Sequence, residues 1–570
     1  MDTGGSSEEP SCVGVEEAAP FTGKKSTKAA TVVDARRWSS VANVVVVVLI
    51  MTVPLIILIL SGRLDAPAVW INSTMARLGA AEQREPKRDM LLGGLLLPGF
   101  DEQSCASRYQ SVYYRKNMTR SPTPYLLKRL REQEALQRRC GPGTEAYTRA
   151  SQRLKSGERS IMDSVDGCGY LVLLSYRGLG NRVLATVSAF LYATLTNRVL
   201  LVDRGKTFAD LFCEPFQGAT WLLPLDFPLE GYKDLWEGAA ESYGNVTMRN
   251  DTGPASEHRF VYIHLDHAAA PANRLAYCDD HRQFLHRVQW VLLRTDSYMP
   301  PSLFLNPAYR DELARMFPRP DSVFYVISRY LLHPTNDVWG RVTRFYESYL
   351  KNADETLGIQ VRVFDAATPP QNILDQIIAC TSQERLLPGV AASAAGRGTP
   401  ALPAAGARSK AVLITGLNGW YHDRIRDMYW RSPSADGEVV SVHQPSHEEV
   451  QHFFRTMHDK KALAEMYLLS MTDRIVTSGW STFGYVGSAL GGLTPYIMMK
   501  PERKQQEKVP DPPCRRAVSM EPCNHGPAYF ECTRKEIHKI IDTGRLVPHV
   551  RACEDMSWGL KLAEPIEKKV

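Results

Sequence analysis

The chain has 570 residues, more than one hydrophobic core usually organises, so we expect a folded region of two lobes with terminal appendages. Its 68 Lys and Arg residues against 62 Asp and Glu residues give a net charge of +6. This surplus is small for such a long chain. It argues against a nucleic-acid partner, which needs a concentrated basic face, and leaves room for a modest attraction to anionic substrates.

The amino-terminal region predicts a membrane anchor. Residues 1–40 are polar and lack periodicity, as in a disordered tail. Residues 41–60 are interrupted only by Asn43, Thr52 and Pro54, and as a helix they would span a hydrocarbon core of about 30 Å. The run is too long, and too far from the amino terminus, for a cleaved signal peptide. Five Lys and Arg residues between positions 24 and 37 precede the run, which predicts a cytoplasmic amino terminus and a lumenal remainder.

The cysteines agree with a lumenal location. Ten of the eleven follow residue 60, and an even set suits disulfides in an oxidising compartment, although the sequence does not give their pairing. Zinc is the alternative for Cys514, Cys523, Cys532 and Cys553, but their spacing is unlike the short pairs of zinc sites. Candidate glycosylation sequons beyond the anchor begin at Asn72, Asn117, Asn245 and Asn250.

Hydrophobic patterns predict two α/β units after a stem at residues 61–104. The first, within 105–320, contains a strand at 170–175, a glycine turn at 177–182, a helix and a strand at 199–203. The second, within 321–510, has strands at 359–365, 411–415, 474–478 and 494–499. Its helices are expected near 336–353, 371–381, 447–470 and 485–490. Residues 388–409 are expected to be a flexible insertion, and 511–570 a cysteine-rich end segment.

Three stretches carry candidate chemistry. Gly178 and Gly180 lie at a strand-to-helix turn, where backbone amides can meet an anion, although a plain tight turn has the same pattern. Arg362 lies in the predicted strand 359–365, where it would suit a diphosphate or form an ion pair with Asp365. Residues 477–485 combine hydroxyls, glycines and aromatics after a strand, which suits phosphate and sugar contacts or a hydroxyl-rich helix cap.

The absence of certain motifs narrows the chemistry. The chain has no Asp-x-Asp, the arrangement that often holds a divalent ion on a sugar-nucleotide diphosphate. Arginine and backbone amides would then stabilise the leaving group, which favours a metal-independent transferase with no cofactor. The chain also lacks G-x-S-x-G and H-E-x-x-H, which counts against serine hydrolases and zincins.

The motifs resemble those of the plant fucosyltransferases typified by xyloglucan α-1,2-fucosyltransferase. The matching stretches are 175–182, 301–305, 328–339, 359–365, 477–486, 511–514 and 520–523, in family order between residues 166 and 553. The resemblance implies an α/β fold of GT-B-like type with two Rossmann-like lobes. In such a fold GDP-fucose binds the carboxyl-terminal lobe, and the acceptor binds on the amino-terminal side.

The resemblance also implies roles for individual residues. Arg362 corresponds to the arginine that engages the GDP diphosphate. The donor-lining positions are Ser481, Thr482, Phe483 and, in the same run, Tyr485. The loop that faces the reaction centre and the acceptor comprises Arg177, Gly178, Gly180, Asn181 and Arg182. Asp296 matches an aspartate considered as the general base, and a structural aspartate that caps a turn is the alternative.

Together these observations predict a Golgi membrane protein, single-pass type II, with a lumenal enzyme. The expected reaction is inverting transfer of L-fucose from GDP-fucose to a terminal galactose, in α-1,2 linkage. The expected acceptor is a cell-wall glycan such as xyloglucan or arabinogalactan protein. Fucosylation of a protein or another glycan, and a non-catalytic glycan-binding Golgi protein, are the alternatives. Oligomeric state is left open, with a homodimer as one candidate.

Overall fold

The computed structural model describes residues 89–115, 120–159, 162, 166–174, 176–279, 283–364, 368–391, 406–500, 508–527, 532 and 547–565. The chain divides into Met1–Lys87 and a compact unit, Arg88–Val570, which contains all of these residues. Within the described residues, no helix has both the length and the apolar character needed to cross a bilayer. The predicted tail, the anchor at 41–60, and the sequons at Asn72 and Asn117 lie outside the described residues.

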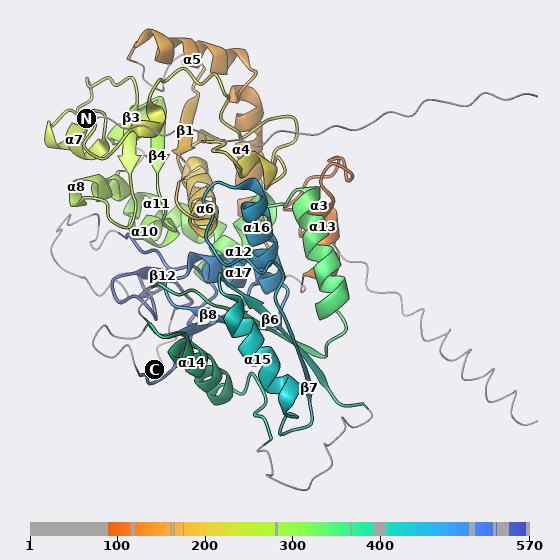
Figure 1. Ribbon diagram of the computed structural model, residues 1–570. Helices are drawn as coiled ribbons and strands as arrows, with labels where there is room; N and C mark the ends of the chain where they lie inside the picture. The colour runs from red at the N-terminus through yellow and green to blue at the C-terminus, as the bar shows by residue number, and fades with distance from the viewer. Residues whose placement is uncertain are drawn as a thin grey trace, which may run out of the picture. The chain divides into compact units, whose positions relative to one another are not determined.

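The first sheet has four parallel strands in the order β2-β1-β4-β3 (Figure 1). They are β1 (Gly169–Leu174), β2 (Arg198–Val202), β3 (Val261–His264) and β4 (Trp290–Arg294). Successive side chains of a strand point to opposite faces, so Leu171 and Leu173 join a different core from Tyr170 and Val172. Helix α6 (Leu179–Leu195) packs on the first face and α5 (Glu145–Ser156) on the second. The strand, turn, helix and strand predicted over 170–203 are therefore confirmed.

The ordered core begins earlier than the sequence indicated. Residues 89–104 were expected to belong to a stem, with the folded region starting at Cys105. Instead Leu92, Leu95 and Leu96 are buried and pack with Leu126 and Leu130. The two leucines belong to α4 (Pro124–Cys140), which follows α3 (Ala106–Tyr114). The apolar run at 91–97 is thus part of the core because a helix face later in the chain covers it.

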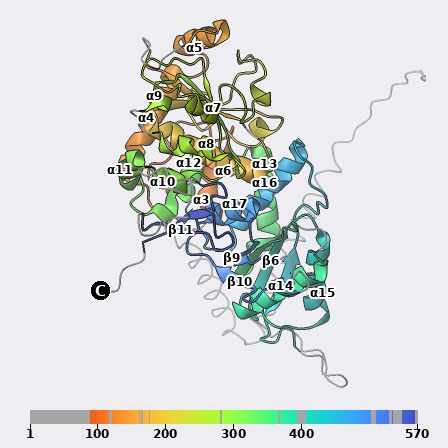
Figure 2. The same cartoon turned by 90° about the vertical axis from the view of Figure 1, so that its left-hand side faces the viewer.

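The second sheet has six strands in the order β10-β9-β8-β5-β6-β7, all parallel except β10. Its strands are β5 (Glu355–Gln360), β6 (Ser409–Thr415), β7 (Val439–His443), β8 (Arg474–Ser478), β9 (Tyr496–Met498) and β10 (Cys514–Arg516). One face packs against α14 (Pro370–Gln383) and α15 (Gly419–Arg431), which Figure 2 shows beside this sheet. The other face packs against α16 (Thr456–Ser470) and α17 (Thr482–Gly491).

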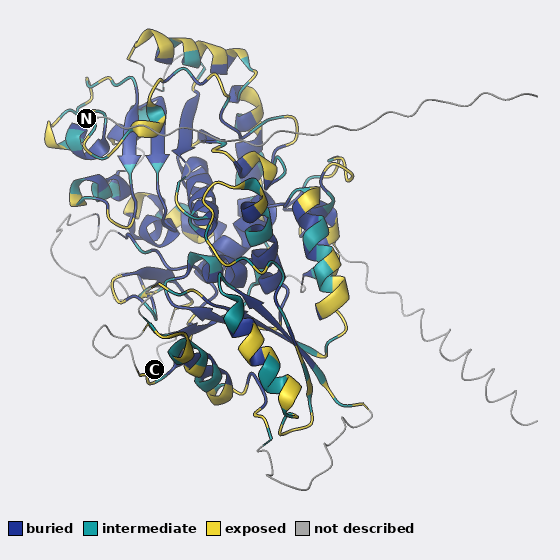
Figure 3. Ribbon diagram, viewed as in Figure 1, coloured by how far each residue is buried: buried dark blue, intermediate teal, exposed yellow. Residues whose placement is uncertain are grey.

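The two sheets share one continuous core. Helices α16 and α17 contact α6 of the first sheet directly. Helices α12 (Val323–Leu331) and α13 (Asn336–Phe345), the latter continued by the π-helical turn η5 (Tyr346–Leu350), pack into the same cluster. Figure 3 shows the first sheet and the central strands of the second sheet largely buried, whereas the edge strand β7 and helices α13 and α15 have exposed residues. The shared core holds the ends of α6 and α17 against each other.

Shorter elements connect these layers. Helices of four to ten residues are α7 (Tyr243–Met248), α8 (Pro271–Arg274), α9 (Phe284–Arg287), α10 (Pro300–Leu305) and α11 (Pro307–Met316). Short 3-10 turns are η1 (Phe208–Asp210), η2 (Tyr232–Asp234), η3 (Leu275–Cys278) and η4 (Pro320–Ser322). The strands β11 (Val550–Ala552) and β12 (Leu560–Leu562) form a separate antiparallel pair.

The two sequons within the described residues differ in their surroundings. Asn245 lies in α7, where its side-chain amide donates hydrogen bonds to the carbonyls of Gly238 (3.0 Å) and Ala239 (2.9 Å). Asn250 is exposed just after that helix. A glycan on Asn245 would replace an amide hydrogen that now binds backbone, so Asn250 is the more accessible acceptor.

Two predicted elements have different bounds in the structure. The strand expected at 359–365 begins earlier, as β5, and ends at Gln360, so Arg362 lies in the loop after the strand and not within it. The helix expected from 447 starts only at Thr456, and residues 444–455 form a loop. Apolar residues continue beyond both elements, and Val361, Phe364 and Phe453 among them line a cavity. In the sequence such residues have the same apolar pattern as a buried strand or helix.

Five disulfides pair all ten of the expected lumenal cysteines: Cys105 with Cys213, Cys140 with Cys168, Cys278 with Cys532, Cys380 with Cys514, and Cys523 with Cys553. The four cysteines considered for zinc are therefore all engaged as disulfides. Two of these bonds attach the carboxyl-terminal segment to earlier parts of the fold, through Cys278 and Cys380, and a third lies within the segment itself.

The ends of the expected insertion at 388–409 are ordered. Leu387 is buried, and residues next to it pair with the loop before β7, since Ala391 donates to the carbonyl of Pro433 and Ala435 to that of Gly389. Ser409 opens β6. The central residues 392–405 lie outside the described part of the chain.

Candidate active site

The amino-terminal ends of α6 and α17 meet at one point. Gly178 precedes the first residue of α6, and Ser481 caps α17 by accepting a hydrogen bond from Gly484 N–H. A Cβ atom on Gly180 would lie 2.7 Å from Thr482 Oγ1 and 2.9 Å from Phe483 N. Only glycine permits this approach. Each helix start carries unpaired amides and a partial positive charge, so their meeting point favours an anion.

A cavity of about 510 Å³ opens beside this meeting point. Most of the site residues predicted from the sequence line it, namely Arg177, Gly178, Gly180, Asn181, Asp296, Arg362, Ser481, Thr482 and Phe483. They come from both sheets: the turn after β1, the loop after β4, the loop after β5 and the start of α17. Their convergence places the candidate site at the carboxyl edges of both parallel sheets, where α/β proteins bind their ligands.

Two predicted residues do not line the cavity. Arg182 is buried behind it, where its guanidinium donates to Asp459 Oδ2 (2.6 Å) and to Thr207 Oγ1 (2.9 Å). Its role in the structure is to tie α6 to α16. Tyr485 is also buried, and its hydroxyl donates to Asp555 Oδ2 at 2.5 Å.

Arg362 reaches the cavity from the loop after β5. Its backbone N–H donates to Ser478 Oγ (2.9 Å), which fixes the loop to β8. Among the described residues no carboxylate forms a salt bridge with its guanidinium, and the alternative partner Asp365 lies outside them. Burial lowers the pKa of Arg362, but an arginine remains charged at neutral pH. Among the described residues, the cavity is thus lined by a cation that has no carboxylate partner.

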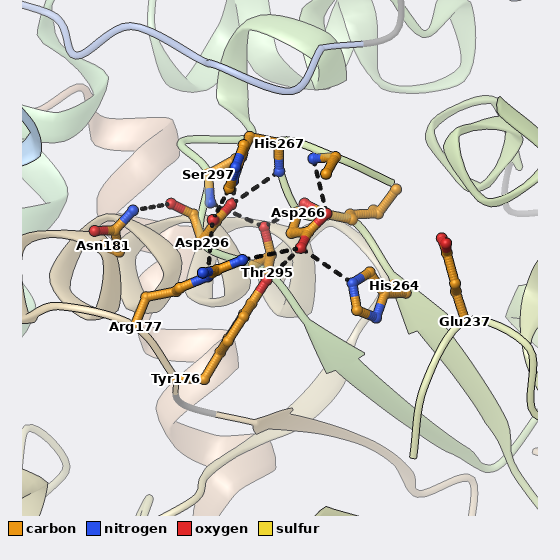
Figure 4. Close-up of polar contacts among 12 residues, drawn as sticks. Tyr176, Arg177, Asn181, Glu237, His264, Asp266, His267, Thr295, Asp296 and Ser297 are labelled. Carbon is orange, nitrogen blue, oxygen red and sulfur yellow. Dashed lines mark hydrogen bonds and ion pairs between the residues drawn. The ribbon is translucent and has the colours of Figure 1, made fainter. Parts of the chain in front are cut away.

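A polar cluster forms the wall on the side of the first sheet (Figure 4). Arg177 has a left-handed φ of 68°, and its guanidinium lies 3.7 Å from Asp296 Oδ2 and 3.8 Å from Asp266 Oδ2. Asp296 also accepts from the His267 ring at 2.6 Å. Although burial opposes the shift, hydrogen bonds from His264 and Tyr176 lower the pKa of Asp266 well below its usual range.

Asp266, His267 and Asp296 are the described residues whose potential ligand atoms lie close enough together, within 4.8 Å, to be considered for a metal ion. These atoms are already engaged in the hydrogen bonds of Figure 4. The Arg177 guanidinium also places a positive charge beside both carboxylates. This charge offsets part of the negative charge of the two carboxylates and repels a second cation.

The carboxyl-terminal segment completes another wall. Asp555 accepts from the backbone N–H of Trp480 (2.6 Å), and its carbonyl accepts from the indole of the same residue (2.5 Å). This holds the neighbouring Met556 and Trp558 against the cavity. His525 also lines it, and burial lowers the pKa of this imidazole.

Another part of the cavity, its acidic end, is lined by carboxylates. Glu448, Asp459 and Glu465 line it, together with Ser446, Gln451 and His458. Glu448 is neutralised by Lys461 (2.6 Å), and Asp459 by Arg182. Burial raises the pKa of Glu465 to about 7. The cavity thus combines the Arg362 guanidinium and two helix starts with acidic acceptor oxygens.

Sequence reasoning missed the acidic end, His267, and the residues of the carboxyl-terminal segment. Glu465 was inside a predicted helix and was not distinguished from a surface charge. The one signal available for it was its place among apolar neighbours such as Leu463, Ala464 and Met466. His267 follows a short strand that was not predicted, so nothing placed it near Asp296.

Comparisons with known proteins agree with one another. The family model for xyloglucan fucosyltransferase matches residues 70–533. The chain is 50% identical to a galactoside 2-alpha-L-fucosyltransferase of Arabidopsis thaliana over 478 residues, 83% of each chain. It is also 50% identical to a protein of the same name from Pisum sativum over 481 residues, 84% of this chain and 82% of that one.

A solved structure shows a similar fold. It is a mutant of Arabidopsis thaliana FUT1 in complex with GDP, with a TM-score of 0.76 and 49% sequence identity. The match covers 83% of this chain and all of that one.

Replacing Gly180 with alanine tests the helix contact. A Cβ atom would press on the backbone of Thr482 and Phe483, so we expect Gly180→Ala to lower the free energy of unfolding by about 1–3 kcal/mol. Gly253→Ala is the matched control, because its Cβ would meet nothing nearer than 3.8 Å, and its effect should stay within about 0.5 kcal/mol. Denaturant unfolding of both variants measures the difference. Equal stabilities would contradict the close approach.

Proposed function

The chain belongs to the xyloglucan fucosyltransferase family, and on this basis we propose that it transfers L-fucose from GDP-fucose to a terminal galactose. The linkage would be α-1,2, formed with inversion, on a cell-wall glycan such as xyloglucan or arabinogalactan protein. One observation carries the proposal: Arg362, which has no carboxylate partner among the described residues, and two helix amino termini converge on one cavity. Such a site suits the diphosphate of a sugar nucleotide.

The donor would bind the second lobe in a GT-B-like arrangement. Arg362 would pair with the diphosphate, and the first amides of α17, at Thr482 and Phe483, would donate to its oxygens. The similar FUT1 structure is a complex with GDP, which supports a guanosine nucleotide as a ligand of this chain. As the bond between fucose and diphosphate breaks, negative charge grows on the leaving GDP. The same fixed donors then stabilise that charge.

The acceptor would enter from the first lobe. Asn181, His267 and Asp296 form the wall there, and the exposed aromatic rings of Phe364, Phe453 and Trp558 border the cavity. Flat rings at the rim suit the apolar faces of sugars. An oligosaccharide with a terminal galactose would thus place its 2-hydroxyl between the wall and the donor.

The reaction would need no divalent metal. Arg362 and two helix starts supply positive charge where the leaving group develops negative charge. Arg177 also places a positive charge beside the carboxylates of Asp266 and Asp296. The protein itself therefore provides the charge stabilisation that an ion supplies in other sugar-nucleotide transferases.

The enzyme would work in the Golgi lumen as a single-pass type II membrane protein. The apolar run at 41–60 and the charges before it support this location. The five disulfides add support, because structural disulfides persist in the secretory pathway and are rare in the cytosol.

Activity of the purified full-length chain tests the proposal. We expect release of GDP from GDP-fucose that depends on a galactose-terminated xyloglucan oligosaccharide, with the rate unchanged by EDTA. Nuclear magnetic resonance of the product should show an α-1,2 linkage. GDP binding without turnover on any acceptor would indicate a glycan-binding protein, and transfer to a protein or another glycan alone would identify a different acceptor. Loss of the rate in EDTA would contradict the metal-free mechanism.

Substituting Arg362 tests the diphosphate contact. Arg362→Ala should lower kcat/KM for GDP-fucose by about 10²–10³-fold, because a fixed donor to the leaving group is lost. Arg362→Lys should recover only part of this loss, since an ammonium cannot donate as a planar fork. Arg424→Ala, an exposed arginine of α15 outside the cavity, is the control and should retain the full rate. If Arg362→Ala binds GDP as tightly as the unmodified chain, the assignment is wrong.

A further inference from the structure

The carboxylate of Asp296 is fully engaged by protein groups. Its Oδ1 accepts from the His267 backbone N–H and the Ser297 hydroxyl, both at 3.0 Å, and its Oδ2 accepts from His267 Nδ1 at 2.6 Å (Figure 4). The side chain is only 3% exposed, whereas that of His267 is 50% exposed and lines the cavity. The group that meets a substrate at this wall is therefore the imidazole and not the carboxylate.

The tautomer of His267 follows from the same contact. An ionised carboxylate can only accept, so Nδ1 carries the hydrogen and Nε2 keeps its lone pair. Within the described part of the chain, Nε2 has no hydrogen-bond partner. The second bond, from the His267 backbone to Asp296, prevents the ring and the carboxylate from moving apart.

We propose that His267 Nε2 takes the proton from the acceptor hydroxyl and that Asp296 is the positioning residue that orients it. This inference rests on the proposed transfer of fucose. The hydroxyl oxygen bonds to C1 of fucose as the bond from C1 to the β-phosphate oxygen breaks. GDP leaves with the electron pair of that bond, and the hydroxyl proton moves to Nε2. The resulting imidazolium lies beside the negative charge of Asp296 and later releases its proton to water.

Four charged or titratable groups surround the imidazole: Asp296, Asp266, Arg177 and His525. The hydrogen bond to Asp296 raises the pKa of His267, and burial lowers it. The negative charge of Asp266 also raises this pKa, whereas the positive charge of Arg177 lowers it. The base must be neutral to accept a proton. Activity should therefore rise with pH through the raised pKa of His267 and level off above it.

Variants of the full-length chain separate the two roles. His267→Ala should lower kcat by about 10²–10⁴-fold while GDP affinity stays unchanged, and added imidazole should restore part of the rate. Asp296→Asn should lower kcat and also move the acidic limb of the pH profile to lower pH, because the charge that raises the pKa of His267 is gone. His443→Ala, outside the cavity, is the control.

Two outcomes would overturn the inference. One is a His267→Ala variant with more than half of the original kcat and an unchanged pH profile. The other is a large loss in Asp296→Asn but not in His267→Ala, which would make the carboxylate itself the base. Unchanged GDP affinity shows that a variant is folded. If the unmodified chain transferred no fucose at all, the proposed function would fail instead.

A second observation concerns the acidic end of the cavity. Glu465 is 5% exposed, and its Oε1 accepts from Ser446 Oγ at 2.5 Å. Unlike Glu448 and Asp459, it forms no salt bridge among the described residues. A buried carboxyl group of this kind is costly unless a ligand supplies further donors.

The sheet order places this group at the far end from Arg362. Arg362 follows β5 and α17 follows β8, whereas Ser446 follows β7, two positions away from β5 in the sheet. A nucleotide whose diphosphate lies at Arg362 would thus extend its base along the sheet edge toward Glu465. The Watson–Crick edge of guanine has two adjacent hydrogen-bond donor groups, N1–H and the 2-amino group.

We infer that Glu465 recognises guanine through these two donors and selects GDP over other nucleoside diphosphates. This assignment also rests on the proposed function. Burial raises the pKa of the free carboxyl to about 7, and two donated hydrogen bonds favour its charged form. Binding of GDP should accordingly release a proton near neutral pH.

Nucleotide analogues test this contact by calorimetry. The unmodified chain should bind GDP about ten-fold more tightly than inosine diphosphate, which lacks the 2-amino group. In Glu465→Gln that difference should disappear, and xanthosine diphosphate, with an oxygen at C2, should gain affinity because the glutamine amide can donate to it. Glu449→Gln, outside the cavity, is the control. A Glu465→Gln variant with the original preference for GDP over inosine diphosphate would overturn the assignment. That result would not contradict the proposed fucose transfer, which the transfer assay tests separately.

Discussion

The close approach of Gly180 to Thr482 is the contact on which the site depends. It brings the starts of α6 and α17, which pack against different sheets, within van der Waals distance, and a side chain at position 180 would separate them. The hydrogen bond from Thr482 to Asn181 (3.2 Å) and the buried ion pair between Arg182 and Asp459 hold the same junction. The cavity, lined by residues that follow strands of both sheets, keeps its dimensions because this junction holds the two helix starts together.

The charges around the cavity follow a consistent arrangement. Asp266 and Asp296, on the side of the first sheet, share the positive charge of Arg177, and at the acidic end Glu448 pairs with Lys461 and Asp459 with Arg182. Arg362 and Glu465 line the cavity without a salt-bridge partner among the described residues. A ligand that is anionic at one end and rich in N–H donors at the other would satisfy both, and a guanosine diphosphate has these properties.

The sequence predicted the parts of the fold that local patterns determine. The strand, glycine turn and helix around Gly180 follow from hydrophobic periodicity, and so do the later strands of the second sheet. Arg362 was placed within a strand because Val361 and Val363 continue the apolar pattern beyond β5. The carboxyl-terminal wall could not be predicted, since it depends on contacts between Trp480 and Asp555, which are far apart in sequence.

Membership of a motif did not determine which way a side chain points. Asn181 and Arg182 are neighbours in one motif, but consecutive residues of a helix differ by about 100° around its axis. One therefore meets the cavity while the other points into the protein. Thr482 and Tyr485, one helical turn apart in α17, have different partners: Thr482 meets Asn181 at the cavity, and the Tyr485 hydroxyl donates to Asp555.

The position of the cavity wall late in the chain has a consequence for biosynthesis. Met556 and Trp558 are translated after both sheets, and the bond between Cys523 and Cys553 anchors the segment that carries them. A nascent chain that has exposed only residues up to about 546 can assemble both sheets but leaves one side of the cavity open. The cavity is thus completed only after the residues of both sheets have been translated.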